Sequence, residues 1–244
     1  MVLSPALPSE LLSFIVTRCA HPTTLIVCSS HADFLSGLVS DVRGTDHGSL
    51  FEDVQPEEWN GRPERPSTPT PAARRLLQAP LYQVATARHI RMVFVPTVSH
   101  LRAFLAVFSP EDSKIPEPPP STRPGLPGPG SGKRPPLLVI YGFVELHRHT
   151  SEWSAQGMSS TAATLVEAAR RESFRAVIVD GKGVGHGGEQ AREAMPVLSG
   201  TARRRGPDAE EGGWTGRTVE VRRILGRWFR FQHVAWETDD VYLQ

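Results

Sequence analysis

Basic side chains gather around a glycine-rich stretch late in the sequence. The stretch DGKGVGHGGEQAR covers residues 180–192, and a run of three arginines follows downstream. The candidate contacts are Lys182, His186, Arg192, Arg203, Arg204 and Arg205. Such side chains can neutralise the phosphates of DNA and release counterions without reading the base sequence. A long turn beside a solvated arginine run would have the same composition, so the sequence leaves both interpretations open.

Three other motifs could carry chemistry, and each departs from its pattern. GVGHGG at 183–188 has the glycine spacing of a dinucleotide-binding loop, but no acid on a following strand is placed to hold a ribose. GPGSGKR at 128–134 lacks the preceding strand, the following helix and the Ser or Thr after lysine that a phosphate-binding loop needs. Cys19, His21, Cys28 and His31 fit no common zinc spacing. We therefore expect no metal site and no cofactor.

The composition indicates one core domain without a dominant electrostatic field. The chain has 244 residues, 39% of them hydrophobic, and its 27 basic and 26 acidic side chains give a net charge of +1. No segment reaches the roughly 18 consecutive apolar residues of a membrane-spanning helix, so we expect no membrane partner. The two cysteines are too few for a disulfide framework, which favours a reducing compartment.

Proline separates the segments expected to be ordered from those expected to be disordered. The chain holds 22 prolines, and they concentrate in stretches that offer little apolar surface to bury. The sequence predicts a single domain over residues 1–244. Within it, we expect a disordered insertion at 52–78, a Pro-rich disordered linker at 110–136 and a surface loop at 203–216.

The remaining segments alternate between helical and strand patterns. Apolar residues at helical spacing predict helices over 9–20, 30–42, 97–108 and 159–173, with Ser9 as the N-cap of the first. Near-continuous apolar runs predict strands over 23–29, 89–95, 137–143 and 174–180. This alternation is typical of an α/β fold, with a mostly parallel sheet covered by helices on both faces.

The C-terminal part has a different pattern. GRTVEVRRI and RWFRFQHV flank Leu225 and Gly226 as two alternating runs, which predict an antiparallel β-hairpin. Its basic residues Arg222, Arg223, Arg227 and Arg230 would then face away from the core. Such a face is compatible with a protein interface or with DNA.

This order of elements resembles the RecA-like core of the recombinase paralogues. The residues that carry the resemblance are the strand LLVIYGF, the strand RAVIVD with its Gly-rich loop, and the late run GRTVEVRRILGRWFRF. The resemblance covers roughly residues 8–236 and implies a P-loop NTPase fold. Short RecA-like proteins of this type occur in Shu-type complexes that assist homologous recombination, and in the Elongator accessory subcomplex.

The resemblance also implies two ATPase motifs, and neither is intact. The Walker B carboxylate that holds magnesium would stand at the position of Tyr141, and a phenol cannot replace it. Glu145, the nearest acid, is expected to be a solvated residue at a helix start. The first predicted helix corresponds to the one that follows a P-loop, and only eight residues precede it, too few for the loop. The sequence therefore predicts a pseudo-ATPase without a catalytic residue.

The resemblance gives two functional expectations. The first is a catalytically inactive RecA-like subunit of a heteromeric complex in the nucleus, which assists homologous recombination and DNA repair. Its partners would be RecA-like or recombinase-associated proteins and single- or double-stranded DNA. The alternative is a structural subunit of an Elongator-like complex that acts in tRNA modification.

Overall fold

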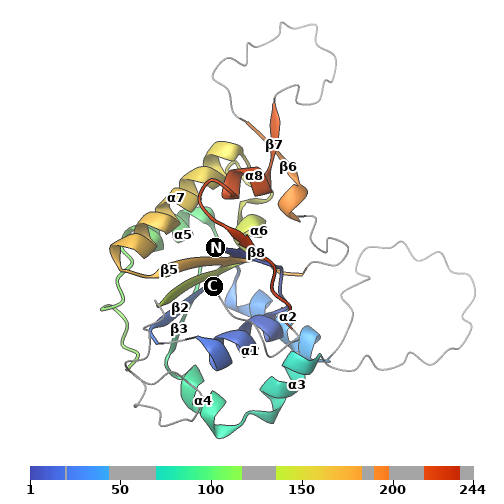
Figure 1. The fold of residues 1–244 in the computed structure, drawn as a ribbon, viewed down its shortest axis with the longest axis vertical. Coiled ribbons are helices and arrows are strands. Elements are labelled where there is room, and N and C mark those ends of the chain that lie inside the picture. The colour runs from blue at the N-terminus through green and yellow to red at the C-terminus, as the bar shows by residue number, and fades with distance from the viewer. Residues whose placement is uncertain (20, 44–69, 117–135, 183–189, 198–216, 237–244) are drawn as a thin grey trace, which may run out of the picture.

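A computed structural model describes residues 1–19, 21–43, 70–116, 136–182, 190–197 and 217–236 (Figure 1). Six strands form a parallel sheet in the order β3-β2-β4-β5-β1-β8. The four longer strands are β2 (Thr23–Val27), β3 (Ile90–Phe94), β4 (Leu137–Tyr141) and β5 (Arg175–Val179). They confirm the four strands that the apolar runs predicted.

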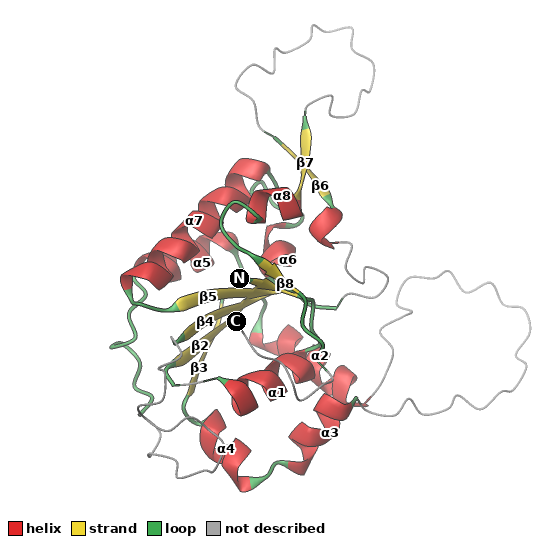
Figure 2. Ribbon diagram, viewed as in Figure 1, coloured by secondary structure: helices red, strands yellow, loops and turns green. Residues whose placement is uncertain are grey.

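Two further strands of the sheet have only two residues each. They are β1 (Val2–Leu3), which lies beside β5, and β8 (Phe231–Gln232), which lies beside β1 (Figure 2). The sequence analysis missed β1 because two residues are too short to show a strand pattern. Its presence means that the chain contains a strand immediately before the first helix.

Helices cover both faces of the sheet, as the helix and strand alternation predicted. One face carries α5 (Val98–Ala106), α6 (Phe143–His147), α7 (Ala155–Arg171) and α8 (Val221–Leu225). The other carries α1 (Pro8–Arg18) and α2 (His31–Arg43). Successive residues of β2 serve the two cores: Ile26 packs with the first group and Leu25 and Val27 with the second.

Two helices fall where the sequence predicted none. They are α3 (Pro71–Gln78) and α4 (Leu81–Ala87), which lie beyond α1 on the face away from α7 (Figure 1). The disorder expected over 52–78 is therefore wrong for residues 71–78, which form α3. The helix begins there because Thr70 accepts the N–H of Ala73 as the N-cap and Pro71 occupies the first turn. The residues of the expected insertion before Thr70, most of the linker at 110–136 and the whole loop at 203–216 lie outside the described residues.

The expected C-terminal hairpin is wrong in its position. The small antiparallel pair joins β6 (Ala194–Pro196) to β7 (Thr218–Glu220), and the residues around Leu225 form α8 instead of a turn. The buried residues Val221, Ile224 and Leu225 have i, i+3, i+4 spacing, which is the spacing of a helix. The last strand then joins the main sheet in parallel with β1.

Candidate functional site

The carboxyl ends of β1, β4 and β5 meet at one edge of the sheet, where open α/β proteins bind their ligands. The loop Ser4–Leu7 leads from β1 into α1 at this edge. Tyr141 ends β4, and Asp180 follows β5 directly. We call this group, with the first turn of α1 and Lys182, the carboxyl-edge site.

The loop between β1 and α1 is fixed to the continuation of β5 by its backbone. The N–H of Ala6 donates to the carbonyl of Asp180 at 2.9 Å, and the N–H of Lys182 donates to the carbonyl of Ala6 at 3.2 Å. The loop spans four residues without glycine or lysine. A phosphate-binding loop needs eight residues from its first glycine to its Ser or Thr, so this loop cannot wrap a phosphate chain.

Tyr141 fills the space between β4 and this loop. Its hydroxyl donates to the carbonyl of Ala6 at 3.0 Å, which bridges β4 to the start of α1. The Tyr141 hydroxyl also lies close to Gly181: a Cβ added to this glycine would stand 3.2 Å from the hydroxyl oxygen. The tyrosine side chain therefore packs against the residues that follow β5 as well. Burial and the nearby charge of Asp180 raise the pKa of Tyr141 well above its usual value. The phenol is therefore neutral and acts as a packed donor.

Two carboxylates of the chain itself occupy the positive end of helix α1. Glu10 Oε2 accepts the N–H of Leu7 at 2.7 Å, and Asp41 Oδ2 accepts the N–H of Ser9 at 2.8 Å. Pro8, between them, has no N–H to offer. The predicted cap Ser9 is wrong, because Leu7 is the N-cap and Ser9 lies inside the first turn. The donors and the helix dipole that would attract a phosphate thus serve internal anions.

Lys182 neutralises one of these anions. Its Nζ lies 2.6 Å from Glu10 Oε1, and the Glu10 side chain is 2% exposed while that of Lys182 is 39% exposed. A buried carboxylate requires such a partner, because desolvation makes an unpaired charge costly. The first of the predicted DNA contacts therefore has a structural role in the fold.

Asp180 is buried behind the site. Its Oδ1 accepts the N–H of Val144 at 2.9 Å, at the start of α6. Burial raises the pKa of Asp180 to about 6, against the opposing effect of this hydrogen bond. Burial and the charge of Asp180 likewise raise the pKa of the Cys28 thiol well above its usual value. Both groups are buried inside the fold.

The other predicted site residues are only partly placed. Arg192 is exposed in the 3-10 turn η1 (Gln190–Arg192), which packs against α8. The other four predicted contacts, His186, Arg203, Arg204 and Arg205, lie outside the described residues. Glu145 is 60% exposed at the start of α6 and bonds Arg148 at 2.8 Å, which agrees with the expected solvated glutamate at a helix start.

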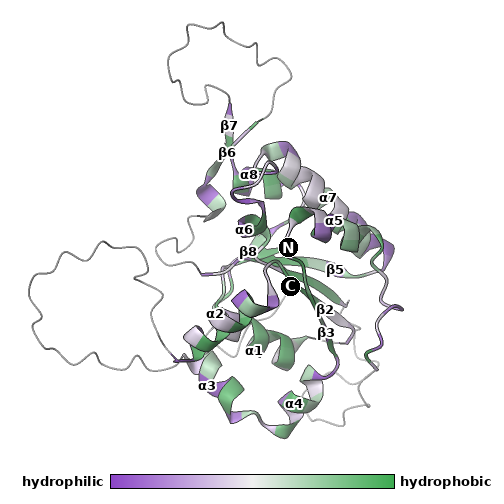
Figure 3. Ribbon diagram, turned by 180° about the vertical axis from the view of Figure 1, so that it is seen from behind, coloured by the Kyte–Doolittle hydropathy of each residue, from purple (hydrophilic) through white to green (hydrophobic). Residues whose placement is uncertain are grey.

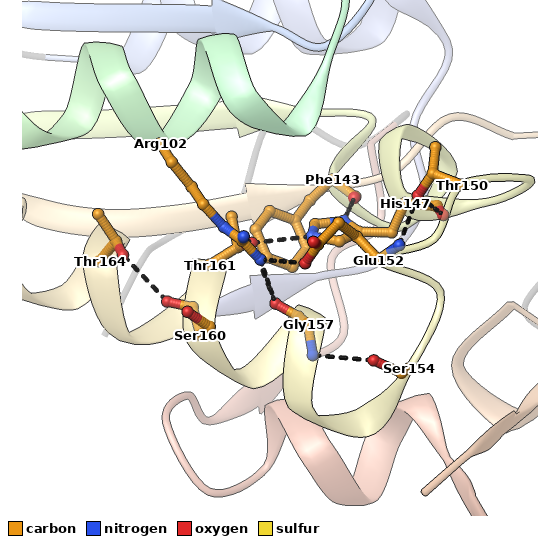
Figure 4. Close-up of polar contacts among 10 residues, drawn as sticks. All are labelled: Arg102, Phe143, His147, Thr150, Glu152, Ser154, Gly157, Ser160, Thr161 and Thr164. Carbon is orange, nitrogen blue, oxygen red and sulfur yellow. Dashed lines mark hydrogen bonds and ion pairs between the residues drawn. The ribbon is translucent and has the colours of Figure 1, made fainter. Parts of the chain in front are cut away.

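A second polar group lies between α5, α6 and α7 (Figure 4). His147 is fully buried; its Nδ1 lies 2.8 Å from the carbonyl of Phe143 and its Nε2 lies 3.0 Å from the hydroxyl of Thr161. The carbonyl only accepts, so Nδ1 carries the proton and Nε2 accepts from Thr161. Burial lowers the pKa of His147, which keeps the ring neutral.

Arg102 completes this group from α5. Its Nε donates to Thr161 Oγ1 at 2.9 Å, and its Nη2 lies 2.8 Å from the carbonyl of Gly157 and 2.6 Å from Glu152 Oε2 (Figure 4). The hydroxyl of Thr161 is thus shared between a histidine and an arginine deep in the helical layer. A histidine beside a hydroxyl resembles a base with its nucleophile, but here both ring nitrogens and the hydroxyl take part in hydrogen bonds that join the helices.

Sequence reasoning missed the residues that close the carboxyl-edge site. Asp180 is the last residue of the strand predicted over 174–180. An acid at the carboxyl end of a parallel strand lies where α/β proteins bind ligands, so the sequence did contain a signal for this residue. Glu10 could have been found as an acid three residues after a helix N-cap. Asp41 and Ala6 carry no local signal, because only the packing of α2 and β5 brings them to the first turn of α1.

Among the described side chains, no group of three His, Cys, Asp or Glu residues is placed to hold a metal ion. None of the helices in the described ranges is long and apolar enough to cross a bilayer. Comparison of the chain with protein-family models, with curated proteins and with solved structures finds no match.

Proposed function

We propose that the chain is a catalytically inactive, RecA-like subunit of a heteromeric nuclear complex that assists homologous recombination and DNA repair. The observation that carries the proposal is the carboxyl-edge site. Its N–H donors serve Glu10 and Asp41, and the hydroxyl of Tyr141, the residue that the resemblance assigns to the Walker B position, is bonded to the carbonyl of Ala6. A fold of this type whose N–H donors serve internal acids is suited to binding rather than to hydrolysis.

The order of the elements supports the RecA-like assignment. β1, the short loop and α1 form a strand, loop and helix unit, which is the unit that carries a P-loop in nucleotide-hydrolysing proteins. β4 ends at Tyr141, and the Gly-rich stretch follows β5, the neighbour of β4 in the sheet. These are the positions that the resemblance assigns to the Walker B residue and to the Gly-rich loop.

Apolar surface on the α1 side supports a protein partner. Large apolar side chains of α2, α3 and α4 are exposed to solvent, and green segments mark these helices in Figure 3. They are Leu35 at 42%, Val39 at 44%, Leu77 at 62%, Leu81 at 88% and Val84 at 41%. Grouped exposure of this kind marks association surfaces in soluble proteins. We assign it to a RecA-like or recombinase-associated partner.

The DNA contact in this proposal is the basic loop that begins at Lys182 and ends at Arg192. Because Lys182 is paired with Glu10, its contribution to phosphate binding is smaller than that of Arg192, which makes no ion pair within the described part of the chain. The proposal therefore places most of the charge on Arg192, His186 and the arginines at 203–205.

The alternative is a structural subunit of an Elongator-like complex. It shares the closed carboxyl-edge site, since a scaffold for tRNA modification also has no need of the nucleotide. The alternative differs from the first proposal in its partner proteins, and it predicts a loss of tRNA modification rather than of recombination in cells that lack the chain.

The test combines partner identification with two cellular measurements. The full chain is tagged at its natural locus, and its co-purifying proteins are identified. Recombination frequency and tRNA modification are then measured in cells without the chain. The proposal predicts recombinase-associated partners and a recombination defect that the parent sequence restores. Co-purification of Elongator subunits, together with a loss of tRNA modification in cells without the chain, would contradict the proposal and favour the alternative.

A further inference from the structure

The segment from β7 to β8 exposes a group of arginines beside a tryptophan. Residues 217–233 contain five arginines and one acid, Glu220. The arginines are Arg217, Arg222, Arg223, Arg227 and Arg230, and all five are exposed. Trp228, in the same segment, is 41% exposed. We call the exposed side of this segment the α8 surface.

The arginines come from α8 and from the turn that follows it, with Arg230 just before β8. The backbone continues to turn after α8, with the N–H of Arg227 donating to the carbonyl of Ile224 and that of Phe229 to Leu225. Arg223 and Arg227 are four residues apart across this turn, while Arg230 lies outside the turn and its carbonyl accepts the N–H of Val2 in β1. The apolar residues between these arginines are buried in the core that α7 shares with the sheet; they are Val221, Ile224, Leu225 and Phe229.

The charges of this surface are available to a ligand. Arg222 lies over the ring of Phe231 at 5.2 Å, which fixes its side chain in place. Arg223, Arg227 and Arg230 make no ion pair with any described residue. This contrasts with Lys182, whose charge a buried glutamate takes up. Unpaired and exposed arginines keep their full attraction for an anion.

Trp228 is held in place while part of it stays exposed. Its Nε1 donates to Ser159 Oγ of α7 at 3.1 Å, which orients the indole against a rigid helix. An aromatic ring oriented in advance loses little conformational entropy when a flat group stacks on it. Bases of single-stranded nucleic acids stack on such rings whatever their sequence.

We propose that the α8 surface binds single-stranded nucleic acid, with Arg223, Arg227 and Arg230 on the phosphates and Trp228 stacked on a base. The pairing of a basic track with an aromatic platform is the arrangement that such ligands require. An acidic protein segment could bind the arginines, but binding such a segment does not require an aromatic ring oriented for stacking. The surface also adjoins Arg192, because η1 packs on α8.

This inference deepens the proposed function and rests on it for the biological role, but it puts the contact on another element than the Gly-rich loop. The two contacts can therefore be separated by substitution. One variant replaces Arg223, Arg227 and Arg230 by alanine. A second replaces Lys182, Arg192, Arg203 and Arg204 by alanine and removes four of the six proposed loop contacts.

The measurement is equilibrium binding of a fluorescent oligothymidine of about 20 nucleotides to the full chain over a range of salt concentrations. Loss of three phosphate contacts should lower the slope of log affinity against log salt by about 2, because each contact to a single strand contributes about 0.7. Trp228→Ala should weaken binding at least about fivefold, and Trp228→Phe, which keeps a ring, should weaken it less.

The matched control replaces Arg43, Arg74 and Arg88 by alanine. These arginines are also exposed and lie on the α2 to α4 side, so the net charge changes equally while the α8 surface stays intact. A loss of affinity in the α8 variant but not in the control supports the inference, whether or not the loop variant also loses affinity. Thermal melting of each variant shows whether it is folded.

Three results would overturn the inference. One is a parent chain that does not bind the oligonucleotide, which would leave an acidic protein segment as the ligand of the arginines. Another is equal loss in the α8 variant and the control, which would mean a nonspecific charge effect. The third is loss in the loop variant alone, which would keep the proposed function and remove the α8 surface from it.

Discussion

The carboxyl-edge site and the α8 surface use basic side chains in opposite ways. At the carboxyl edge, Lys182 is paired with a buried carboxylate and the helix end of α1 is occupied by internal acids. On the α8 surface, three arginines are exposed and have no ion-pair partner among the described residues. The comparison teaches that a basic residue near a glycine-rich loop says little about binding until its partners are known.

The difference has an energetic consequence. Substitutions at the carboxyl edge should change the free energy of unfolding, because each group there is a partner of another buried group. Substitutions on the α8 surface should leave the free energy of unfolding nearly unchanged and should act on ligand binding. Stability and affinity measurements on the same variants can therefore separate the two regions.

The largest effect is expected at Tyr141. Tyr141→Ala removes a ring packed between β4 and the loop before α1, and it should cost about 3 kcal/mol of unfolding free energy. Tyr141→Phe keeps the ring and loses only the hydrogen bond to Ala6, at a cost of about 1 kcal/mol. Chemical denaturation measures both. If Tyr141→Ala were as stable as the parent, the ring would not close the site, and the carboxyl edge would have space for a ligand.

Asp180 should show the cost of a buried charge. Its pKa of about 6 lies above the ordinary value, so the protonated form stabilises the fold below pH 4, and this stabilisation is lost as the pH rises through 6. Asp180→Asn keeps an oxygen for the N–H of Val144 and removes the charge. The variant should exceed the parent by about 2 kcal/mol at pH 7.5 and match it near pH 4.

The control for Asp180 is the pH dependence itself. Denaturation curves of parent and variant at the two pH values isolate the carboxylate from general packing effects. A variant that is less stable than the parent by the same amount at both values would contradict a buried charge, because the loss would then come from the shape of the side chain.

Lys182 should show a smaller effect of the same kind. Lys182→Ala leaves the carboxylate of Glu10 buried without its cation, which should cost about 1 kcal/mol once screening of the half-exposed ammonium is allowed for. In a Glu10→Gln background the same substitution should cost little. Arg227→Ala, on the α8 surface, should stay within about 0.5 kcal/mol of the parent. Equal costs for Lys182→Ala and Arg227→Ala would erase the distinction between the two regions.

The long elements were predictable from the sequence, and the short ones were not. Strands such as Leu137–Tyr141 show continuous apolar runs, and α7 has a helical pattern over 17 residues. β1 and β8 have two residues each, and only their neighbours in the sheet make them strands. The helix α8 was taken for a strand because arginines alternate with apolar residues over a few positions, and five residues fit either period.

The candidate site was predictable only at single positions. The end of the strand at Tyr141 was predicted from the apolar run, and the structure places the Tyr141 hydroxyl against the carbonyl of Ala6. The roles of Glu10 and Asp41 depend on contacts across 3 and 32 residues of the chain, and the second distance cannot be read from a local pattern. Lys182 was correctly seen as basic, but its buried partner lies 172 residues away.

Binding of magnesium and ATP tests the central claim most directly. The account predicts that millimolar MgATP leaves the melting temperature of the full chain unchanged, because N–H donors of α1 serve Glu10 and Asp41 and the Tyr141 hydroxyl is bonded to the carbonyl of Ala6. A nucleotide at 100 times its dissociation constant would instead add about 2.7 kcal/mol to the free energy of unfolding. A saturable, magnesium-dependent rise in melting temperature would contradict a closed carboxyl-edge site.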